Sequence, residues 1–168
     1  MSVSGSINLQ IGIIQAAAFD LSAAQDNLSS ALTPINTSFT NGTGANKANS
    51  QYHDNFTLAD SASVELNLTD DSLTDKFGEA LTFTFIKALF IRYNSADATL
   101  VYGHSAATPL PIIETTGDGI LIGPGGWDMK MFSGTGYAVA SHNLLKIEDD
   151  GTGAAGGTVD IFILGEVS

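Results

Sequence analysis

The sequence contains no cysteine, few basic residues and no long apolar run. Without cysteine, disulfide bonds and thiolate chemistry are excluded, and the redox compartment stays undetermined. A membrane-spanning helix needs about 18 consecutive apolar residues, and no such stretch is present. The N-terminal MSVSGSINLQ lacks the basic start and apolar run of a signal peptide, so we expect neither secretion by that route nor a membrane span.

Basic residues are scarce relative to acidic ones. The 168 residues include six Lys and Arg against eighteen Asp and Glu, which gives a net charge of -12 at pH 7. A phosphate backbone is bound by clustered Lys and Arg, so we expect neither nucleic acid nor an anionic membrane surface as a direct partner. The acidity instead predicts solubility and mutual repulsion between free subunits. The length suits one domain, or one domain with an arm.

The glycine-rich stretch GDGILIGPGGWDMKMFSG (117–134) lacks the spacing of a phosphate-binding loop. A Walker loop requires Gly-Lys-Ser/Thr, whereas Gly125-Gly126 is followed by Trp127-Asp128. The Gly-x-Gly pairs here also lack the third glycine of a dinucleotide fingerprint. We therefore interpret Gly123 to Gly126 as a structural turn and expect no bound nucleotide or other cofactor.

No pattern of catalytic or metal-ligating residues is evident, and we predict that the protein is not an enzyme. His53, His104 and His142 match no local metal-ligand spacing, and no Gly-x-Ser-x-Gly elbow is present. Two acidic clusters leave calcium open as an alternative to solvated loop charges, although neither has EF-hand spacing. They consist of Asp70, Asp71 and Asp75, and of Glu148, Asp149, Asp150 and Asp160.

The N-terminal third divides into an apolar segment and a polar one. Ile7, Leu9, Ile11 and Ile13 recur at every second position, which predicts a strand or extended arm reaching about Phe19. Residues 20–49 are rich in Ser, Thr, Asn and Gly, which predicts an exposed loop or hinge. We therefore divide the chain into an arm and flexible loop over 1–50 and a β-domain over 51–168.

Short strands punctuated by turns fill the remainder of the chain. Residues 81–94 form the most apolar segment, which predicts a strand in the middle of a sheet with a bulge around Lys87-Ala88. Residues 120–122 and 127–132 flank the Gly123–Gly126 turn and suggest a hairpin. About eight to ten such strands predict an all-β sandwich or barrel.

Trp127, Met129 and Met131 alternate along the strand after this turn. Most such rows in sandwiches pack in the core. Trp and Met are also enriched at the centres of protein interfaces, so the row could be specialised for a contact. Both interpretations remain open from the sequence.

Ordered blocks from about Asp20 to the C-terminus resemble a family of small tailed-bacteriophage virion proteins. The blocks are the GTGA loop (42–45), the segment LTDKFGEALTFTFIKAL (73–89), the Pro-Gly-Gly turn, TGYAV (135–139) and the closing DIFILGEV (160–167). The family hairpin is aliphatic after Pro-Gly-Gly, so Trp127, Met129 and Met131 depart from it. The resemblance implies a jelly-roll-like antiparallel β-sandwich with an extended N-terminal arm, and a non-enzymatic role on the particle.

These features together predict a virion structural protein. The favoured role is a capsid decoration (cement) protein on the capsid surface, and the alternative is a tail or fibre component that contacts a host receptor or glycan. The expected partners are the major capsid protein or another virion protein, and further copies of the chain in a homotrimer. The candidate interface residues are Ile7, Leu9, Ile11, Ile13, Trp127, Met129 and Met131.

Overall fold

The computed structural model describes residues 5–9, 14–16, 25–27, 35–103, 108, 110, 119–132, 134–140 and 142–168. These residues form strands and turns, and no helix occurs among them. The strands are β1 (Gly5–Leu9), β2 (Ile14–Ala16), β3 (Gln25–Asn27), β4 (Ile35–Asn41), β5 (Lys47–Ala48), β6 (Ser50–Leu58), β7 (Ser63–Asn67), β8 (Leu73–Thr74), β9 (Ala80–Leu81), β10 (Phe83–Asn94), β11 (Leu100–Tyr102), β12 (Ile120–Ile122), β13 (Trp127–Met131), β14 (Tyr137–Ala138), β15 (Leu144–Asp149) and β16 (Gly157–Val167).

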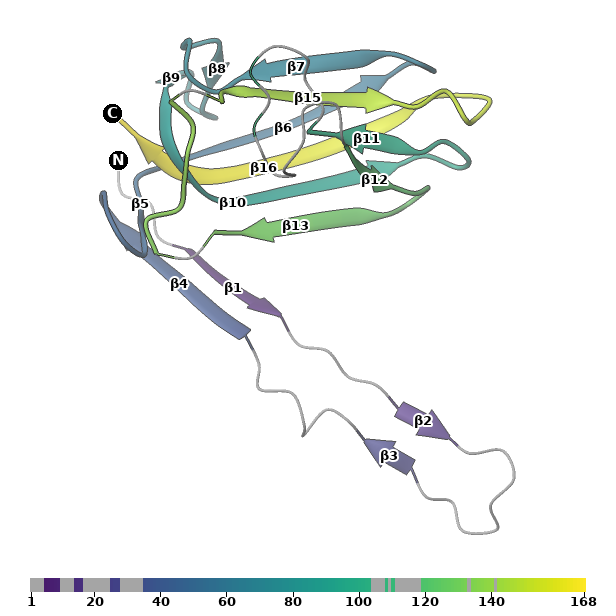
Figure 1. Ribbon diagram of the computed structural model, residues 1–168, viewed down its shortest axis with the longest axis horizontal. Coiled ribbons are helices and arrows are strands. Elements are labelled where there is room, and N and C mark those ends of the chain that lie inside the picture. The colour runs from purple at the N-terminus through teal and green to yellow at the C-terminus, as the bar shows by residue number, and fades with distance from the viewer. Residues whose placement is uncertain are drawn as a thin grey trace.

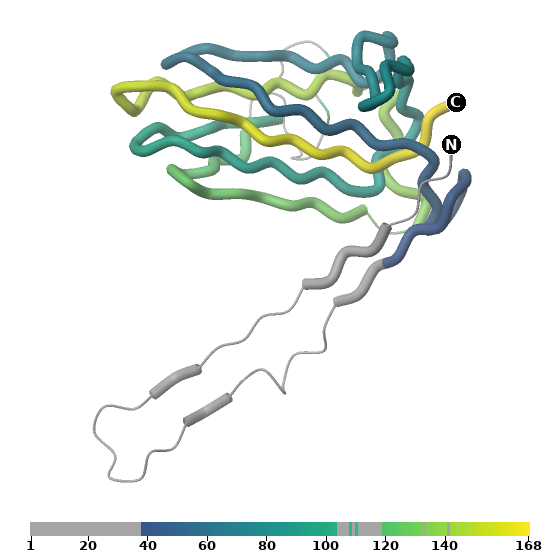
Figure 2. The backbone as a smooth tube through the Cα atoms, turned by 180° about the vertical axis from the view of Figure 1, so that it is seen from behind, coloured from purple at the N-terminus to yellow at the C-terminus, as the bar shows by residue number. Residues whose placement is uncertain are grey.

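Two antiparallel sheets form the body of the protein (Figure 1). Sheet I has the strand order β13-β10-β16-β6, with β14 also paired to β10, and Figure 2 shows its four long strands side by side. Sheet II has the order β12-β11-β15-β7. The strands pair first with last: β6 with β16, β7 with β15, β10 with β13, and β11 with β12. This nested pairing is the jelly roll, and it confirms the predicted fold class.

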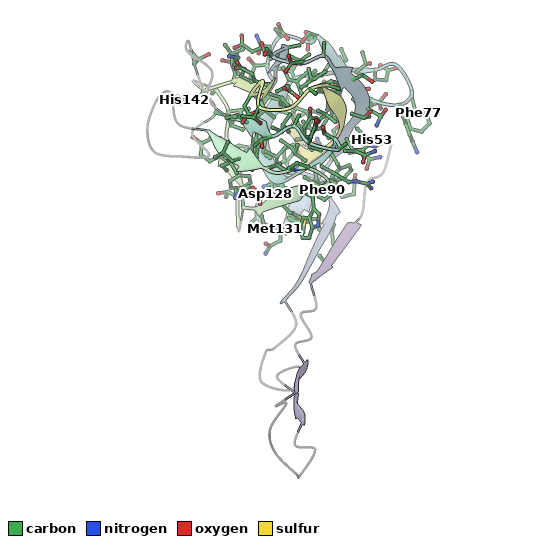
Figure 3. All side chains as sticks on the ribbon, turned by 90° about the vertical axis from the view of Figure 1, so that its right-hand side faces the viewer. His53, Phe77, Phe90, Asp128, Met131 and His142 are labelled. Atoms are coloured by element: carbon green, nitrogen blue, oxygen red, sulfur yellow. The ribbon has the colours of Figure 1, made fainter. Side chains whose placement is uncertain are left out.

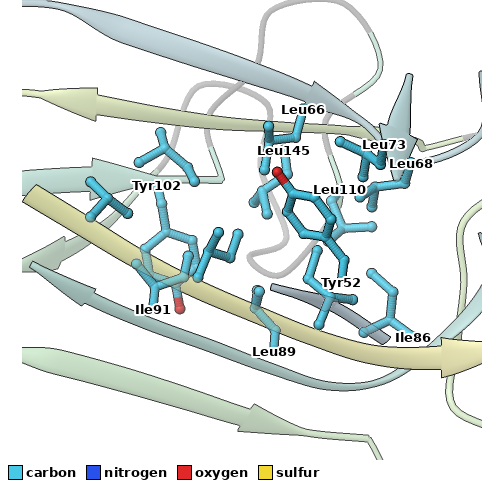
Figure 4. Packing of buried hydrophobic residues seen from close by; sticks show 14 of the residues in the cluster. Tyr52, Leu66, Leu68, Leu73, Ile86, Leu89, Ile91, Tyr102, Leu110 and Leu145 are labelled. Carbon is cyan, nitrogen blue, oxygen red and sulfur yellow. The ribbon is translucent and has the colours of Figure 1, made fainter. Parts of the chain in front are cut away.

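The core lies between the two sheets (Figure 4). On β10 the alternate residues Leu89, Ile91 and Tyr93 are at most 1% exposed, and they face Leu145 and Ile147 of β15 within the same cluster. The period-two pattern of the sequence therefore places one side of each strand in the core. β10 lies inside sheet I, as its apolar composition predicted.

The predicted bulge in β10 is confirmed. Ile86 pairs with Gly165 and Ala88 with Leu164, so Lys87 is an extra residue without a partner across β16. A bulge of this kind bends the strand and redirects the side chain of the extra residue. It also restores the register that the alternation loses at this point.

The Gly123–Gly126 segment is a turn, but the predicted hairpin is wrong. The Gly126 amide donates to the Gly123 carbonyl at 2.9 Å, and Gly125 has a φ of 68°, which favours glycine. β12 pairs with β11 in sheet II, whereas β13 pairs with β10 in sheet I. The turn therefore carries the chain from one sheet to the other, because the jelly-roll pairing separates two strands that are adjacent in sequence.

The polar segment 20–49 contains strands, which differs from the predicted loop. β1 pairs antiparallel with β4, so that Gly5 lies opposite Phe39 and Leu9 opposite Ile35, and β2 pairs with β3. Ile7 and Leu9 thus belong to a strand paired within the same chain, while Ile11 and Ile13 lie outside the described residues. The sandwich begins with β6 at Ser50; the division of the chain into an arm and a domain remains a prediction.

Candidate interaction surface

The outer face of sheet I carries an apolar strip. Leu89 and Ile91 point into the core, so Phe90 between them points outward. Residues directly opposite each other on paired strands lie on the same face, and Phe90 lies opposite both Met129 and Phe162. We call Phe90, Trp127, Met129 and Phe162 the open strip.

Trp127 is the most exposed member of the open strip. Its side chain is 57% exposed, and its ring stacks on Phe90 with a centroid separation of 6.2 Å and an interplanar angle of 29°. Trp127 lies opposite Arg92, which in turn lies opposite Asp160. The alternating row of Trp127, Met129 and Met131 therefore lies outside the core between the sheets, which differs from the core interpretation, although Met131 packs against a second buried cluster on the outer face. Its role in a contact remains a prediction.

One end of the same outer face is covered by the chain itself. Phe39 of β4 and Ala48 of β5 pack over Ala88 and Leu164, which are 2% and 4% exposed, and Met131 and Phe162 border this cluster. Figure 3 shows Phe90 and Met131 on the side of the sandwich that β1 and β4 adjoin. The face therefore continues from a covered end into the open strip.

A buried ion pair fixes the covered end. Lys87 Nζ lies 2.5 Å from Glu166 Oε1, and their side chains are 0% and 5% exposed. Lys87 also donates to the carbonyl oxygens of Gly44, at 3.0 Å, and Thr135, while the Gly44 amide donates to Glu166 Oε1 at 2.8 Å. Gly44 lies in the turn between β4 and β5, so the pair ties that turn to the bulge in sheet I.

Sequence reasoning did not assign this ion pair. The sequence pattern marks Lys87 only as a break in the apolar alternation of residues 81–94. A lysine within the most apolar segment is itself a signal, because a buried ammonium group needs a carboxylate and hydrogen-bond acceptors. Its partner Glu166 lies far from Lys87 in the sequence, close to the C-terminus. The pairing of β10 with β16 brings the two residues together.

The second acidic cluster does not converge on one point. Asp149 is fully buried and accepts hydrogen bonds from the Tyr93 hydroxyl and from the amides of Ser61 and Gly151. Burial by itself raises the pKa of Asp149, but the hydrogen bond from Tyr93 and those from the two amides outweigh it and lower that pKa. The Asp149 carboxylate thus has a structural role, because its hydrogen bonds join β10 to the loops that contain Ser61 and Gly151.

The other acidic residues also have partners of their own. Asp160 accepts from Asn55 and lies 3.9 Å from Arg92, and Glu148 pairs with Lys146. In the first cluster the partners are Ser72 for Asp70, Thr82 for Asp71, and the amides of Phe77 and Glu79 for Asp75. Among the described residues, no three His, Asp or Glu side chains come together as metal ligands would.

The histidines lie apart. His53 on β6 and His142 near β15 are both exposed, and Figure 3 shows them on different sides of the sandwich, while His104 lies outside the described residues. His53 borders a polar cavity of about 270 Å³, lined also by Tyr52, Asp54 and residues 72–76. This volume is below the roughly 300–1,000 Å³ of ordinary small-molecule sites.

Comparison with known proteins gives no family. No family model and no curated protein matches the chain. The chain is similar to a solved structure, the cryo-EM structure of the extra small virus VLP of the giant freshwater prawn Macrobrachium rosenbergii. The match has a TM-score of 0.31 and 10% identity, and it covers 69% of this chain and 80% of that chain. A likeness at this level carries no argument about function. Within the described part of the chain, no helix is long and apolar enough to cross a membrane.

Proposed function

We propose that this chain is a non-enzymatic structural protein of a virus particle, and that it binds the capsid surface as a decoration protein. The observation that carries the proposal is the jelly-roll strand order combined with an outward-facing apolar strip. Jelly rolls occur in viral capsid, lectin and cupin domains, so the fold by itself does not choose among these roles. The sequence resemblance to phage virion proteins favours the first.

A structural role agrees with what the polar residues do. Tyr93 donates to Asp149 across the core, Tyr102 donates to Asp128 at the open edge of the sandwich, and Lys87 neutralises Glu166. Each of these groups has its partner within the fold. We therefore propose no catalytic centre and no cofactor for the described residues.

In this proposal the N-terminal arm binds the capsid shell. β1 lies at the end of the order β1-β4-β5, so one of its sides faces no other described strand. A strand edge of this kind can pair with a strand of a neighbouring protein, which gives affinity through main-chain hydrogen bonds. The expected neighbour is the major capsid protein or an adjacent copy.

Co-sedimentation with purified particles that lack the protein tests the proposal. The full chain should sediment with the particles, and a variant without residues 1–19 should bind more weakly while keeping the melting behaviour of the sandwich. A truncated protein that binds as tightly as the full chain would contradict the role of the arm. If the full chain does not bind these particles but does bind host cells or glycans, the chain is a tail or fibre component instead.

A further inference from the structure

The open strip and the residues in register with it carry no net charge. Across the three cross-strand rows of this face the described charged residues are Arg92 and Asp160, which cancel, and the remaining members are apolar or amide side chains and His53. Acidic residues outside these rows include Asp60, Asp97 and Asp150, which lie in the connections that follow β6, β10 and β15. A chain of net charge -12 thus presents a neutral apolar face.

We propose that a second copy of this chain docks on the open strip. Two copies that repel each other over most of their surface can approach closely only where the surface is neutral. Contact between two such strips places Phe and Trp rings against Met and Phe side chains, which are among the residues enriched at interface centres. A basic partner would instead be drawn to the acidic turns.

Arg92 and Asp160 make the strip complementary to itself. Their side chains lie 3.9 Å apart and are 53% and 33% exposed, so the intramolecular pair is loose. When two copies meet face to face, the Arg92 of each can approach the Asp160 of the other. The same patch then serves both subunits, as a two-fold symmetric dimer requires; this contact differs from those of the homotrimer that the sequence predicts, because the interfaces of a three-membered ring join two different patches.

The covered end of the face shows how the open end becomes buried. Where β4 and β5 lie on sheet I, Phe39 reduces the exposure of Ala88 and Leu164 to a few per cent. Phe162 of the open strip packs against this covered cluster, and so does Met131, which lies beside the strip on β13. Docking of a second copy extends an apolar contact that the chain already makes with itself. This self-association is independent of the proposed role on a capsid.

The fluorescence of the purified protein tests the inference directly, because Trp127 is the chain's single tryptophan. Its emission should shift to the blue as the protein concentration rises, in parallel with an increase in mass by sedimentation velocity. Added salt should tighten the association, because at 0.1 M the repulsion between exposed charges more than about 10 Å apart is largely screened. The same shift in an isolated protein cannot come from any other partner.

Three variants make the test specific. Trp127→Ala should raise the dissociation constant of the oligomer by about 30-fold, as truncation of a central tryptophan does. Met129→Ser should act in the same direction and serves if the first variant folds poorly. Leu121→Ala is the matched control, because Leu121 is 67% exposed on β12 of the other sheet, and it should change nothing.

A protein that stays monomeric at every concentration and salt level would overturn the inference. So would an oligomer that Leu121→Ala disrupts as strongly as Trp127→Ala. If the chain remains monomeric and Trp127→Ala instead abolishes binding to shells, the strip belongs to a different protein partner and the second copy is excluded.

Discussion

Removal of the Lys87 ammonium group should destabilise the protein strongly. Lys87→Met leaves the Glu166 carboxylate buried without its counter-ion, and it leaves the carbonyls of Gly44 and Thr135 without a donor. Breaking one side of a buried ion pair costs about 3–5 kcal/mol of the free energy of unfolding. For a chain of 150–250 residues each kcal/mol moves Tm by about 2–4 °C, so we expect Tm to fall by roughly 6–20 °C.

A double variant separates the ion pair from the packing around it. In Lys87→Met combined with Glu166→Gln, no buried charge remains, and the glutamine oxygen can still accept from the Gly44 amide. The double variant should therefore be more stable than Lys87→Met alone, because the uncompensated charge accounts for most of the loss.

Chemical denaturation at neutral pH gives the free energy of unfolding of the single and the double variant. Lys146→Met is the control, because Lys146 is partly exposed and pairs with Glu148. The control should lose at most about 1 kcal/mol. A Lys87→Met variant as stable as the parent protein would refute this role of the ion pair, and so would a double variant no more stable than Lys87→Met.

Three further predictions concern buried polar groups and turns. Because the folded pKa of Asp149 is lowered, its contribution to stability is present above the unfolded pKa of about 3.9 and is lost as the pH falls through the folded value. In denaturant titrations, Asp149→Asn should therefore lower the free energy of unfolding at pH 7 by roughly 1–3 kcal/mol and make that free energy less dependent on acid pH. Burial, followed by the hydrogen bond to Asp128, raises the pKa of Tyr102, so the contribution of Tyr102 to stability is present below the unfolded pKa of about 10 and is lost at higher pH. Ultraviolet titration should show that the Tyr102 phenolate forms only together with base-induced unfolding, and a Tyr102 that titrates freely in the folded protein would contradict this. Gly136 has a φ of 86°, and a Cβ there would lie 2.5 Å from the Ile86 carbonyl oxygen, whereas Gly125 has a φ of 68° and open space around it. Thermal melts should therefore show a larger loss of stability for Gly136→Ala than for Gly125→Ala, because Gly125→Ala carries only a backbone penalty of about 1 kcal/mol.

Local patterns in the sequence were sufficient for the central strand β10 and its bulge and for the Gly123–Gly126 turn, but not for the strands within residues 20–49. The alternation in residues 81–94 and its break predicted a central strand with a bulge, and the structure shows the skipped register at Lys87. The Pro-Gly-Gly segment predicted a turn, and Gly125 supplies the positive φ. These features depend on neighbouring residues, which is why the sequence reveals them.

Features that depend on distant pairing were not predictable in the same way. Alternation along β13 separates Trp127 and Met129 from Asp128, but it does not say which set faces the core. The structure turns Asp128 toward Tyr102 at the edge of the sandwich and leaves Trp127 outside, because the register with β10 places Trp127 opposite the outward-facing Arg92. The hairpin prediction failed for the same reason, since β12 and β13 find partners far away in the sequence.

The copy number of the protein in purified virions tests the central claim most directly. Quantitative mass spectrometry against the major capsid protein gives this ratio without any assumption about the binding surface. A decoration protein is expected in numbers comparable to those of the major capsid protein, because it covers a repeating shell. A handful of copies per particle would place it in the tail and contradict the account, and its absence from virions would contradict any structural role in the particle.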